Sequence, residues 1–482
     1  MVLASSRYTS LNPEQRSLSW VQVASGAPYF LTADGQPWTL IGQNDAITWP
    51  DFAGLFRRQR VATVEGHLAW LASHGVTCLR LMLEYCQTEH RYLERPIGRF
   101  QPNMVRLWDD LFALCEKHGL RVLLTPYDTF WMWRRWRFHP YSRAQGGPIL
   151  RRNQWLISSD MRAAIKERLA FAAERWGGSG ALFAWDLWNE IHPAHAGNNP
   201  AVFHEFISDI SQHLREVEMR CFGRTHPQTV SLFGPVLTAH PSVGEVIFRH
   251  PELDFATTHF YDAATIDHPR DTVGAAHRTG VLMREALGQL PVAKPFFDSE
   301  HGPIHTFNNR RRTLPASFDD EYFRHMQWAH LAAGGAGGGL RWPYRHPHVL
   351  THGMRAAQRS LADFVTLIDW ACFRRRNLNQ EVRLSSTAFA CFACGDTDQA
   401  IVWLLRLDCT TKKSGTLSKR VPPLPVQLML PELAAGFYTI RLWDTVAGNE
   451  IGQLTGQAEG GQLVINLPAV RADLALAVVK TA

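Results

Sequence analysis

The sequence predicts an α/β fold, a (β/α)8 TIM barrel, followed by a C-terminal all-β sandwich domain. Between residues 38 and 375, short β-branched or apolar runs alternate with longer amphipathic runs, which is typical of βα units around a parallel sheet. From about residue 385 the helical periodicity ends, and short alternating runs separated by turn residues follow. The chain therefore divides into residues 1–37 (an N-terminal segment with a β-hairpin), 38–375 (the barrel) and 385–482 (the sandwich).

Eight strands are expected in the barrel, at residues 38–42, 76–83, 120–125, 181–187, 229–233, 255–260, 295–298 and 337–342. Helical periodicity lies between or after them at residues 64–73, 105–117, 161–176, 201–221, 275–287, 319–333 and 354–370. The first two helices each end before a His-Gly pair, and Ser158 is a good N-terminal cap for the third. Eight strands that alternate with helices are most simply joined in a closed barrel.

The sequence predicts β-structure at both ends of the chain. Residues 18–36 are expected to form a β-hairpin with Asp34-Gly35 as its turn. The sandwich strands are expected at residues 388–393, 400–407, 426–430, 437–444, 462–466 and 474–479. Because no low-complexity linker precedes residue 385, we expect the sandwich to pack on the barrel.

The composition narrows the function classes. The formal net charge is +6, but the arginine clusters at residues 57–58, 134–135, 310–312 and 374–376 accompany no nucleic-acid-binding motif, so no nucleic-acid partner is expected. No run approaches about 18 uninterrupted apolar residues, so no membrane span is expected. The first ten residues lack the pattern of a secretory signal, and the eight scattered cysteines fit a reducing compartment. We therefore expect a cytoplasmic protein, or a secreted one if a signal had been removed.

Two glutamates stand at the ends of predicted barrel strands. Glu190 follows the fourth strand in the run W-D-L-W-N-E, and Glu300 follows the seventh in the run D-S-E-H-G. Catalytic groups of such barrels lie at the C-terminal strand ends, and strands four and seven face each other across the barrel mouth. The two carboxyl groups are therefore expected to meet.

A facing pair of carboxyl groups suits glycoside hydrolysis. One group must be protonated to donate to the leaving oxygen, and the other must be ionised to attack the anomeric carbon. A separation of about 5–5.5 Å favours the retaining, double-displacement reaction. Asn189, beside the first glutamate, could hold the sugar 2-hydroxyl. This chemistry needs neither a cofactor nor a metal, and none is expected.

These motifs resemble those of clan A retaining glycoside hydrolases, most closely family 5, over roughly residues 25–370. The resemblance implies Glu190 as general acid/base and Glu300 as nucleophile. It implies further roles in order along the chain: Arg80 in C-L-R-L supports the nucleophile, His259 and Tyr261 in T-H-F-Y form a pair whose tyrosine orients the nucleophile, and Trp342 is a sugar platform. The hairpin run F-L-T-A-D-G-Q-P and the run L-I-G-Q-N resemble the start of the same family.

Some candidates leave two interpretations open. Asn44 and Asp45 follow the first predicted strand and could bind sugar or cap a turn. Many family 5 members carry a histidine after strand three, where this chain has Tyr127 and Asp128. Trp131 could line a sugar subsite or brace its loop. The histidines His346, His348 and His352 stand close together, but no carboxylate cluster accompanies them, so they do not predict a metal site.

The combined prediction is a retaining glycoside hydrolase that cleaves β-glycosidic bonds through a covalent glycosyl-enzyme. Its expected action is exo, on β-linked oligosaccharides, as in β-mannosidases or β-glucosidases. The alternatives are an endo-β-mannanase or glucanase acting on polysaccharide, a transglycosylase, and a non-catalytic carbohydrate-binding barrel. Sugar identity, linkage, oligomeric state and the role of the sandwich are left open by the sequence.

Overall fold

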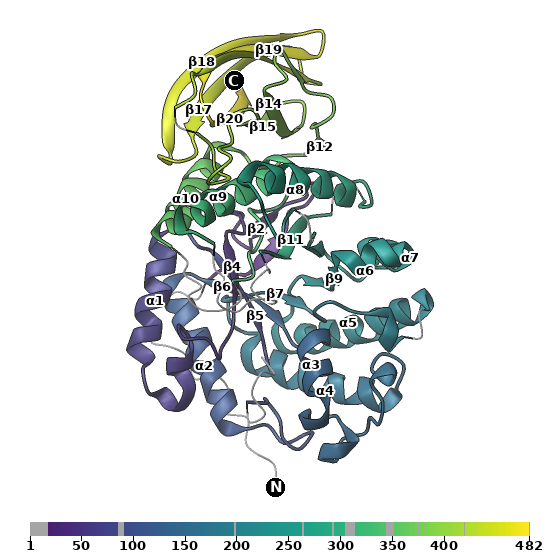
Figure 1. Ribbon diagram of the computed structural model, residues 1–482. Coiled ribbons are helices and arrows are strands. Elements are labelled where there is room, and N and C mark those ends of the chain that lie inside the picture. The colour runs from purple at the N-terminus through teal and green to yellow at the C-terminus, as the bar shows by residue number, and fades with distance from the viewer. Residues whose placement is uncertain are drawn as a thin grey trace.

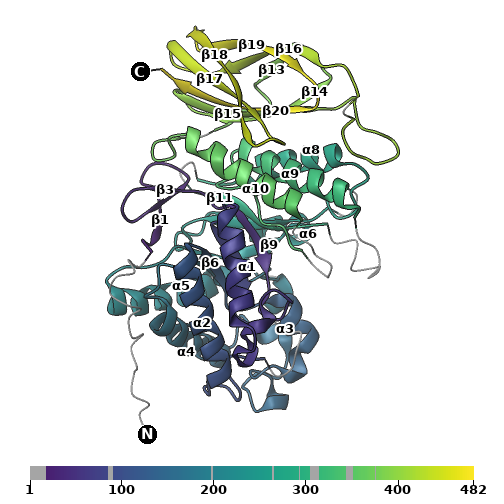
Figure 2. The same ribbon diagram turned by 90° about the vertical axis from the view of Figure 1, so that its left-hand side faces the viewer.

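The computed structural model describes residues 18–84, 91–196, 199–262, 265–291, 294–303, 314–343, 351–374, 376–418 and 420–481. The predicted arginine cluster at residues 310–312, Arg375, and the histidines His346 and His348 lie outside these ranges. A large α/β body carries a smaller all-β body on one side (Figures 1 and 2). None of the helices described is long and apolar enough to cross a membrane.

The α/β body is a closed barrel of parallel strands. They are β4 (Gly42–Asp45), β5 (Cys78–Met82), β6 (Arg121–Thr125), β7 (Leu182–Asp186), β8 (Gln228–Thr229), β9 (Ser231–Phe233), β10 (Ala256–Phe260) and β11 (Phe296–His301). Strands β4 to β8 form one hydrogen-bonded series and β9 to β11 another, and only Val230 separates β8 from β9. Residues 337–341 bridge both β11 and the β4 region, which closes the barrel. The predicted TIM-barrel class is confirmed.

The first and last predicted barrel strands differ in detail. The first was expected at residues 38–42, but the barrel strand is β4, about four residues later. Its polar run Gln43-Asn44-Asp45 looks like a strand end in the sequence. In the structure the whole of β4 is buried, and Asn44 pairs with Arg80 in the register of β5. The eighth strand is reduced to bridges at Gly337 and Arg341.

Helices surround the barrel (Figure 1). They are α1 (Val61–Ser73), α2 (Pro102–His118), α3 (Thr129–Arg135), α4 (Ser159–Trp176), α5 (Pro200–Phe222), α6 (Gly234–Ala239), α7 (Pro241–Phe248), α8 (Thr272–Leu287), α9 (Ala316–Ala332) and α10 (His352–Phe364). The seven predicted helices are present, and the Ser158 hydroxyl caps α4 by accepting the Met161 N–H at 3.3 Å. The short helices α3, α6 and α7 were not predicted, because each is shorter than the window over which helical periodicity can be recognised.

The N-terminal strands cover the end of the barrel at which its parallel strands begin. β1 (Val21–Val23), β2 (Phe30–Thr32) and β3 (Pro37–Trp38) form an antiparallel sheet, and Asp34-Gly35 turns the chain between β2 and β3. The Phe30 ring packs at 5.0–6.3 Å (centroid to centroid) from Phe183, Phe255 and Phe297, which stand at the starts of barrel strands. These apolar contacts close the end at which the strands begin, so the C-terminal ends of the strands form the open face of the barrel.

The C-terminal domain is all-β, as predicted. Its strands are β12 (Arg376–Asn377), β13 (Arg383–Leu384), β14 (Phe389–Gly395), β15 (Gln399–Arg406), β16 (Leu424–Pro431), β17 (Gly436–Asp444), β18 (Asn449–Glu459), β19 (Gln462–Val470) and β20 (Asp473–Lys480). One antiparallel series in the order β12-β14-β15-β20-β17-β18-β19-β16-β13 bends around its own apolar core, so the domain is sandwich-like. The sequence missed β18, since its residues are mostly exposed and polar.

This domain rests on α8, α9 and α10 of the barrel (Figure 2). Arg324 of α9 forms a 2.7 Å ion pair with Asp473, and the Trp443 indole N–H donates to the Ser360 hydroxyl of α10 at 3.1 Å. These contacts join the domain to α9 and α10 behind the last barrel strands.

Candidate active site

Two strand ends place the two predicted glutamates at the barrel mouth. Glu300 lies in β11, and Glu190 lies four residues beyond the end of β7. Glu190 has a φ of 52°, a left-handed backbone that costs a non-glycine residue about 1–2 kcal/mol. The turn is held on both sides: the Asn189 N–H donates to the Tyr127 carbonyl at 2.8 Å, and the Glu190 N–H donates to the Ser231 hydroxyl at 3.2 Å. The strained backbone therefore fixes the direction of the Glu190 side chain.

The two carboxyl groups meet across the mouth. One oxygen of Glu190, one oxygen of Glu300 and one ring nitrogen of His259 all lie within 4.8 Å of one another. Both side chains retain some exposure, 17% for Glu190 and 9% for Glu300. Two carboxyl groups this close can act on one glycosidic bond, one by attack on the anomeric carbon and the other by proton donation to the leaving oxygen.

Arg80 of β5 links the groups beneath the two glutamates. Its guanidinium donates to Glu300 Oε2 at 3.0 Å, to Asp186 Oδ2 at 2.7 Å and to Asn189 Oδ1 at 2.5 Å. It also donates to Asn44 Oδ1 at 2.9 Å. The planar, multidentate donor set of arginine explains this choice of residue, because one side chain aligns partners from three strands and from the segment that follows one of them.

Glu300 is surrounded by groups that bind its ionised form. The Tyr261 hydroxyl donates to Oε1 at 2.6 Å, and Arg80 binds Oε2. Burial raises the pKa of Glu300, while His259, Arg80 and the Tyr261 hydrogen bond act in the opposite direction and the Glu190 charge raises it. Both carboxylate oxygens therefore have donors, as a nucleophile held in one orientation requires.

Glu190 has a different environment. Its Oε1 lies 2.8 Å from His259 Nδ1, and burial lowers the pKa of that histidine to about 4, so the ring is neutral at pH 7. Burial raises the pKa of Glu190 to about 7; the Arg80 charge opposes this shift and the Asp186 charge adds to it. A carboxyl group with such a pKa can both donate and accept a proton near neutral pH, as a general acid/base must.

Three functional side chains were missed by the sequence reasoning. Asp186 pairs with Arg80, Ser231 anchors the backbone of Glu190, and Asp298 Oδ1 accepts the Glu300 N–H and the Phe260 N–H, each at 3.1 Å. Asp186 and Asp298 stand inside the two motifs that the sequence singled out. Their signal was a buried carboxylate within an apolar strand, since such a group is almost always paired.

Asp128 takes part in the site through Asn189. The Asn189 amide donates to Asp128 Oδ1 at 2.6 Å, while Asp128 also caps α3 by accepting the Phe130 and Trp131 N–H groups. With its oxygen bound by Arg80, the Asn189 amide is held in one orientation. Burial raises the pKa of Asp128 to about 7, with the Glu190 charge adding to the effect. Of the two candidates after strand three, Asp128 is the one that joins the network.

Tyr127, by contrast, points away from the barrel mouth. Its hydroxyl hydrogen-bonds the Tyr141 hydroxyl at 3.0 Å, and its ring lies under the Arg168 guanidinium, 5.1 Å from centroid to Cζ. Neighbouring residues of an extended segment face opposite sides, so Tyr127 and Asp128 cannot both enter the site.

Asn44 and Asp45 also face opposite sides of their strand. Asn44 faces Arg80, and its amide donates to the carbonyls of Ser299 and Leu340 at 2.9 and 3.1 Å, which ties β4 to the closing segment of the barrel. Asp45 faces outward, accepts the Ala46 N–H at 2.7 Å and lies 4.0 Å from the His67 ring. Asn44 therefore supports the site from below, and the structure places Asp45 outside it.

The two predicted tryptophans lie at the rim. Trp342 follows the closing segment and is 4% exposed, with its ring 5.2 Å from that of Trp49. Trp131 lies in the first turn of α3 and is partly buried, with its ring centroid 5.0 Å from that of Phe130. A role in sugar binding stays a prediction for both.

Three groups among the described residues have ligand atoms close enough together to hold a metal ion. One is Glu190, His259 and Glu300 at the barrel mouth, where Arg80 and Tyr261 already bind Glu300. The second is Asp45, Asp51 and His67 at the outer face of β4, and the third is Asp298, His301 and His330 between β11 and α9.

No protein-family model matches the chain. Among curated proteins, a probable mannan endo-1,4-beta-mannosidase A-1 of Aspergillus terreus is 27% identical over 162 residues, which is 32% of this chain and 40% of that protein. A probable mannan endo-1,4-beta-mannosidase A of Aspergillus clavatus is 23% identical over 209 residues, 42% of this chain and 54% of that protein. The matches thus span about half, or less, of these relatives.

Solved structures match over almost the whole chain. A family 5 glycoside hydrolase from Bacteroides vulgatus has a TM-score of 0.60 at 13% identity and covers 96% of this chain and 93% of its own. The chain is similar to family 5 glycoside hydrolases. An endo-beta-1,4-mannanase from Thermotoga petrophila follows with a TM-score of 0.51 at 12% identity, covering 91% of this chain and 98% of its own. At such identities these two structures establish the fold of this family 5-like barrel together with its β-domain.

Proposed function

We propose that this family 5-like protein hydrolyses β-mannosidic bonds with retention of anomeric configuration. One observation carries the proposal: two carboxyl groups meet within 4.8 Å at the barrel mouth, one bound by Arg80 and Tyr261 and the other beside a neutral histidine. Their contrasting surroundings support Glu300 as the nucleophile and Glu190 as the acid/base.

In the first step, Glu300 attacks the anomeric carbon as the bond to the leaving oxygen breaks. Glu190 gives its proton to that oxygen, so the departing sugar leaves as a neutral alcohol and a covalent glycosyl-enzyme remains. Tyr261 and Arg80 hold the carboxylate of Glu300 before the attack. Asn189, which Asp128 and Arg80 orient, supplies an N–H for the 2-hydroxyl.

In the second step, Glu190 is a carboxylate and removes a proton from water. The resulting oxygen attacks the anomeric carbon from the face that the leaving group vacated, and Glu300 departs as a carboxylate. Two inversions give net retention, and both glutamates return to their starting protonation states. A pKa near 7 for Glu190 suits this double use, because neither the loss nor the gain of its proton is strongly uphill at neutral pH.

The names of similar proteins support mannosides as the substrate class. The two curated relatives described above are named as mannan endo-1,4-beta-mannosidases, and an exo-beta-1,4-mannosidase from an Opitutaceae bacterium has a TM-score of 0.50 at 18% identity. Exo action on short β-linked oligosaccharides, which the sequence favoured, stays part of the proposal. Endo action on mannan is the alternative that the names of the curated relatives favour.

Product analysis tests the proposal. The chain should cleave nitrophenyl β-mannoside faster than the matched β-glucoside and β-galactoside, and NMR should show the β-anomer of the sugar first. With mannopentaose, exo action releases mannose from the first time points, whereas endo action releases mannobiose and mannotriose. Absence of turnover on every β-glycoside of the panel would contradict the hydrolase proposal, and an α-anomer as first product would contradict the retaining mechanism.

A further inference from the structure

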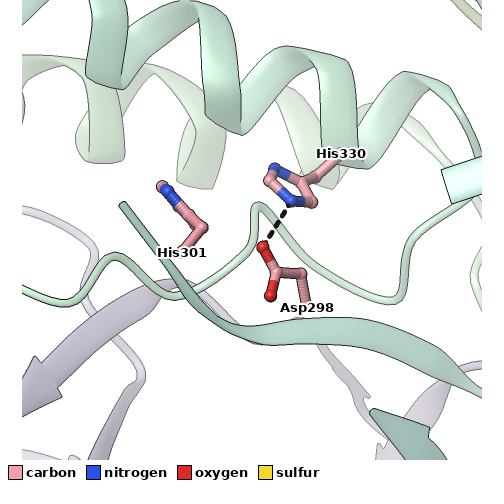
Figure 3. A group of neighbouring side chains, drawn as sticks. All are labelled: Asp298, His301 and His330. Atoms are coloured by element: carbon pink, nitrogen blue, oxygen red, sulfur yellow. Dashed lines mark hydrogen bonds and ion pairs between the residues drawn. The ribbon is translucent and has the colours of Figure 1, made fainter. Parts of the chain in front are cut away.

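Behind the nucleophile strand lies a buried group of two histidines and an aspartate. Asp298 and His301 belong to β11 and His330 belongs to α9, and one ligand atom from each lies within 4.8 Å of the others. Figure 3 shows all three side chains in the layer between the strand and the helix. Their exposed fractions are all 0%. The barrel chemistry proposed above uses neither histidine.

A β-bulge brings the two β11 residues to this layer. The pairing of β10 with β11 shifts between Thr258 and His259, so that Thr258 stands opposite Asp298 and His259 opposite Glu300, with Ser299 as the extra residue. In a regular strand Asp298 and His301 would face opposite sides. The bulge lets both face α9 while Glu300 faces the barrel mouth.

Both histidines have Nδ1 against a backbone carbonyl. His330 Nδ1 donates to the Met326 carbonyl at 2.6 Å, and His301 Nδ1 donates to the Gly302 carbonyl at 3.0 Å. These bonds fix both rings with a proton on Nδ1 and leave Nε2 as a lone-pair donor. Metal-binding histidines usually have this arrangement, with the outer N–H on a backbone carbonyl.

Neither Nε2 atom faces a hydrogen-bond donor among the described residues. His330 Nε2 lies 3.0 Å from Asp298 Oδ2, and His301 Nε2 is buried with no hydrogen-bond partner among the described residues. One proton between His330 and Asp298 would satisfy that pair but would leave the buried His301 Nε2 unmatched, which is unfavourable. A single cation satisfies all three groups together.

We propose that Asp298, His301 and His330 bind a structural divalent metal ion, and that it is Zn²⁺. Two imidazoles and one carboxylate are ligands that zinc accepts, and a buried water completes four-fold coordination. Ligand atoms in tetrahedral zinc sites lie about 3.3 Å apart, given bonds of about 2.0–2.1 Å. The 3.0 Å between His330 Nε2 and Asp298 Oδ2 is close to that separation.

The surroundings are built around the His330 ring. Gly339 has a φ of +73°, and a Cβ there would lie 2.7 Å from His330 Nδ1. Glycine is therefore needed both for its backbone conformation and to admit the imidazole. Because the group is sealed, the ion enters before the fold closes and exchanges slowly afterwards. The site ties β11 to α9, and its role is stability and not chemistry at the mouth.

The test is the metal content of the full-length protein, which does not depend on glycosidase activity. After expression in zinc-supplemented medium and purification without chelator, elemental analysis should give close to one zinc per chain. Unfolding in guanidinium with EDTA, followed by refolding in metal-free buffer, should lower the melting temperature by at least about 4 °C, and added Zn²⁺ should restore it. Refolding with Co²⁺ should give the visible absorption bands of a four-coordinate site.

Variants assign the ligands. His301→Gln and Asp298→Asn should each reduce bound zinc at least tenfold. His325→Gln is the matched control, because His325 is also buried in α9 with Nδ1 on a backbone carbonyl but lies outside the group, so it should keep its zinc. Two results together would overturn the proposal: less than a tenth of a zinc per chain in the native protein, and a melting temperature that changes neither after refolding from EDTA nor on addition of Zn²⁺. The His330–Asp298 contact would then be a hydrogen bond with a shared proton. This wild-type result decides the matter even if a ligand variant does not fold.

Discussion

The cluster around Arg80 and the cluster around Arg168 contain the same kinds of residue but have opposite character. Arg168 of α4 donates to Glu84 at 3.0 Å and to Glu94 at 2.7 Å, and all three side chains are at most 3% exposed. Arg80 binds Asp186 and Glu300 in a similar way, yet the neighbouring Glu190 is 17% exposed. One cluster is sealed, and the other opens to solvent at the barrel mouth.

The two clusters also differ in the protonation of their glutamates. Burial alone would raise the pKa of Glu84, but the Arg168 charge and hydrogen bonds bring it below its ordinary value. Burial raises the pKa of Glu190 to about 7, and Arg80, which does not bind it directly, lowers it only in part. A buried arginine with glutamates therefore marks a reactive site only where one carboxyl group lacks a direct counter-ion and reaches solvent.

The largest difference in activity between the two clusters should come from one matched pair of glutamate substitutions. Glu300→Gln should lower kcat at least about 10⁴-fold, because the amide cannot form the glycosyl-enzyme, while Arg80 keeps Asp186 as its partner. Glu84→Gln should leave kcat of the folded protein within about twofold and reduce stability instead. Steady-state kinetics and guanidinium unfolding of both variants check the pair. Equal activity losses in the two variants would contradict the division between the clusters.

Glu190→Ala should have the next largest effect. Turnover of a substrate with a poor leaving group should fall about 10²–10⁴-fold, because that leaving oxygen needs a proton. A dinitrophenyl glycoside should still form the glycosyl-enzyme, and azide should accelerate its turnover by taking the place of activated water. Rates with both leaving groups, with and without azide, provide the measurement. Equal losses for good and poor leaving groups would show that Glu190 is not the acid.

Arg168→Met should act on stability only. Removing one partner of a buried ion-pair cluster leaves carboxylates without a counter-ion, at a cost of about 3–5 kcal/mol. Arg175→Met is the control: it breaks the pair with Asp109, which is partly exposed, and should cost about 0–1 kcal/mol. Guanidinium midpoints measure both. A kcat/KM of folded Arg168→Met reduced more than about threefold would show that the sealed cluster also serves the reaction.

The pH dependence should reflect the unpaired glutamate. Because Glu190 must be protonated for the first step, kcat/KM should fall as pH rises through about 7. The same pKa, raised above that of the unfolded chain, means that the ionised form destabilises the fold at higher pH. Glu190→Gln should therefore be about 1–2 kcal/mol more stable than the native chain at pH 8, and the gain should vanish near pH 4. An unfolding difference independent of pH would contradict this assignment.

Among the variants expected to slow the reaction, Asp128→Asn should have the smallest effect. Asn can still cap α3 and still offers an oxygen to the Asn189 amide, but the charge that strengthens this bond is lost. We expect kcat/KM to fall about tenfold, with Asn189→Ala giving the larger loss and the double variant adding little to it. Additive losses in this double-mutant cycle would mean that Asp128 does not act through Asn189.

The barrel and the meeting of the two glutamates could be predicted from the sequence, because both depend on hydrophobic periodicity and on the order of the elements along the chain. Alternating strands and helices gave the barrel, and strand ends brought Glu190 and Glu300 together. Asp128 and Tyr127 could not be separated, since the choice depends on which face of an extended segment turns inward. The bulge at Ser299 was equally hidden, because an extra residue in a strand leaves no compositional signal. Asp186 and Ser231 were missed for a third reason: they act through Arg80 and a backbone N–H, not on substrate.

Trapping of the covalent intermediate tests the central claim most directly. Incubation with a dinitrophenyl 2-deoxy-2-fluoro-β-mannoside, followed by proteolysis and mass spectrometry, should find one fluorosugar per chain, esterified to Glu300. Attachment to any other carboxylate, or turnover of the ordinary mannoside by a protein that is never labelled, would contradict the account.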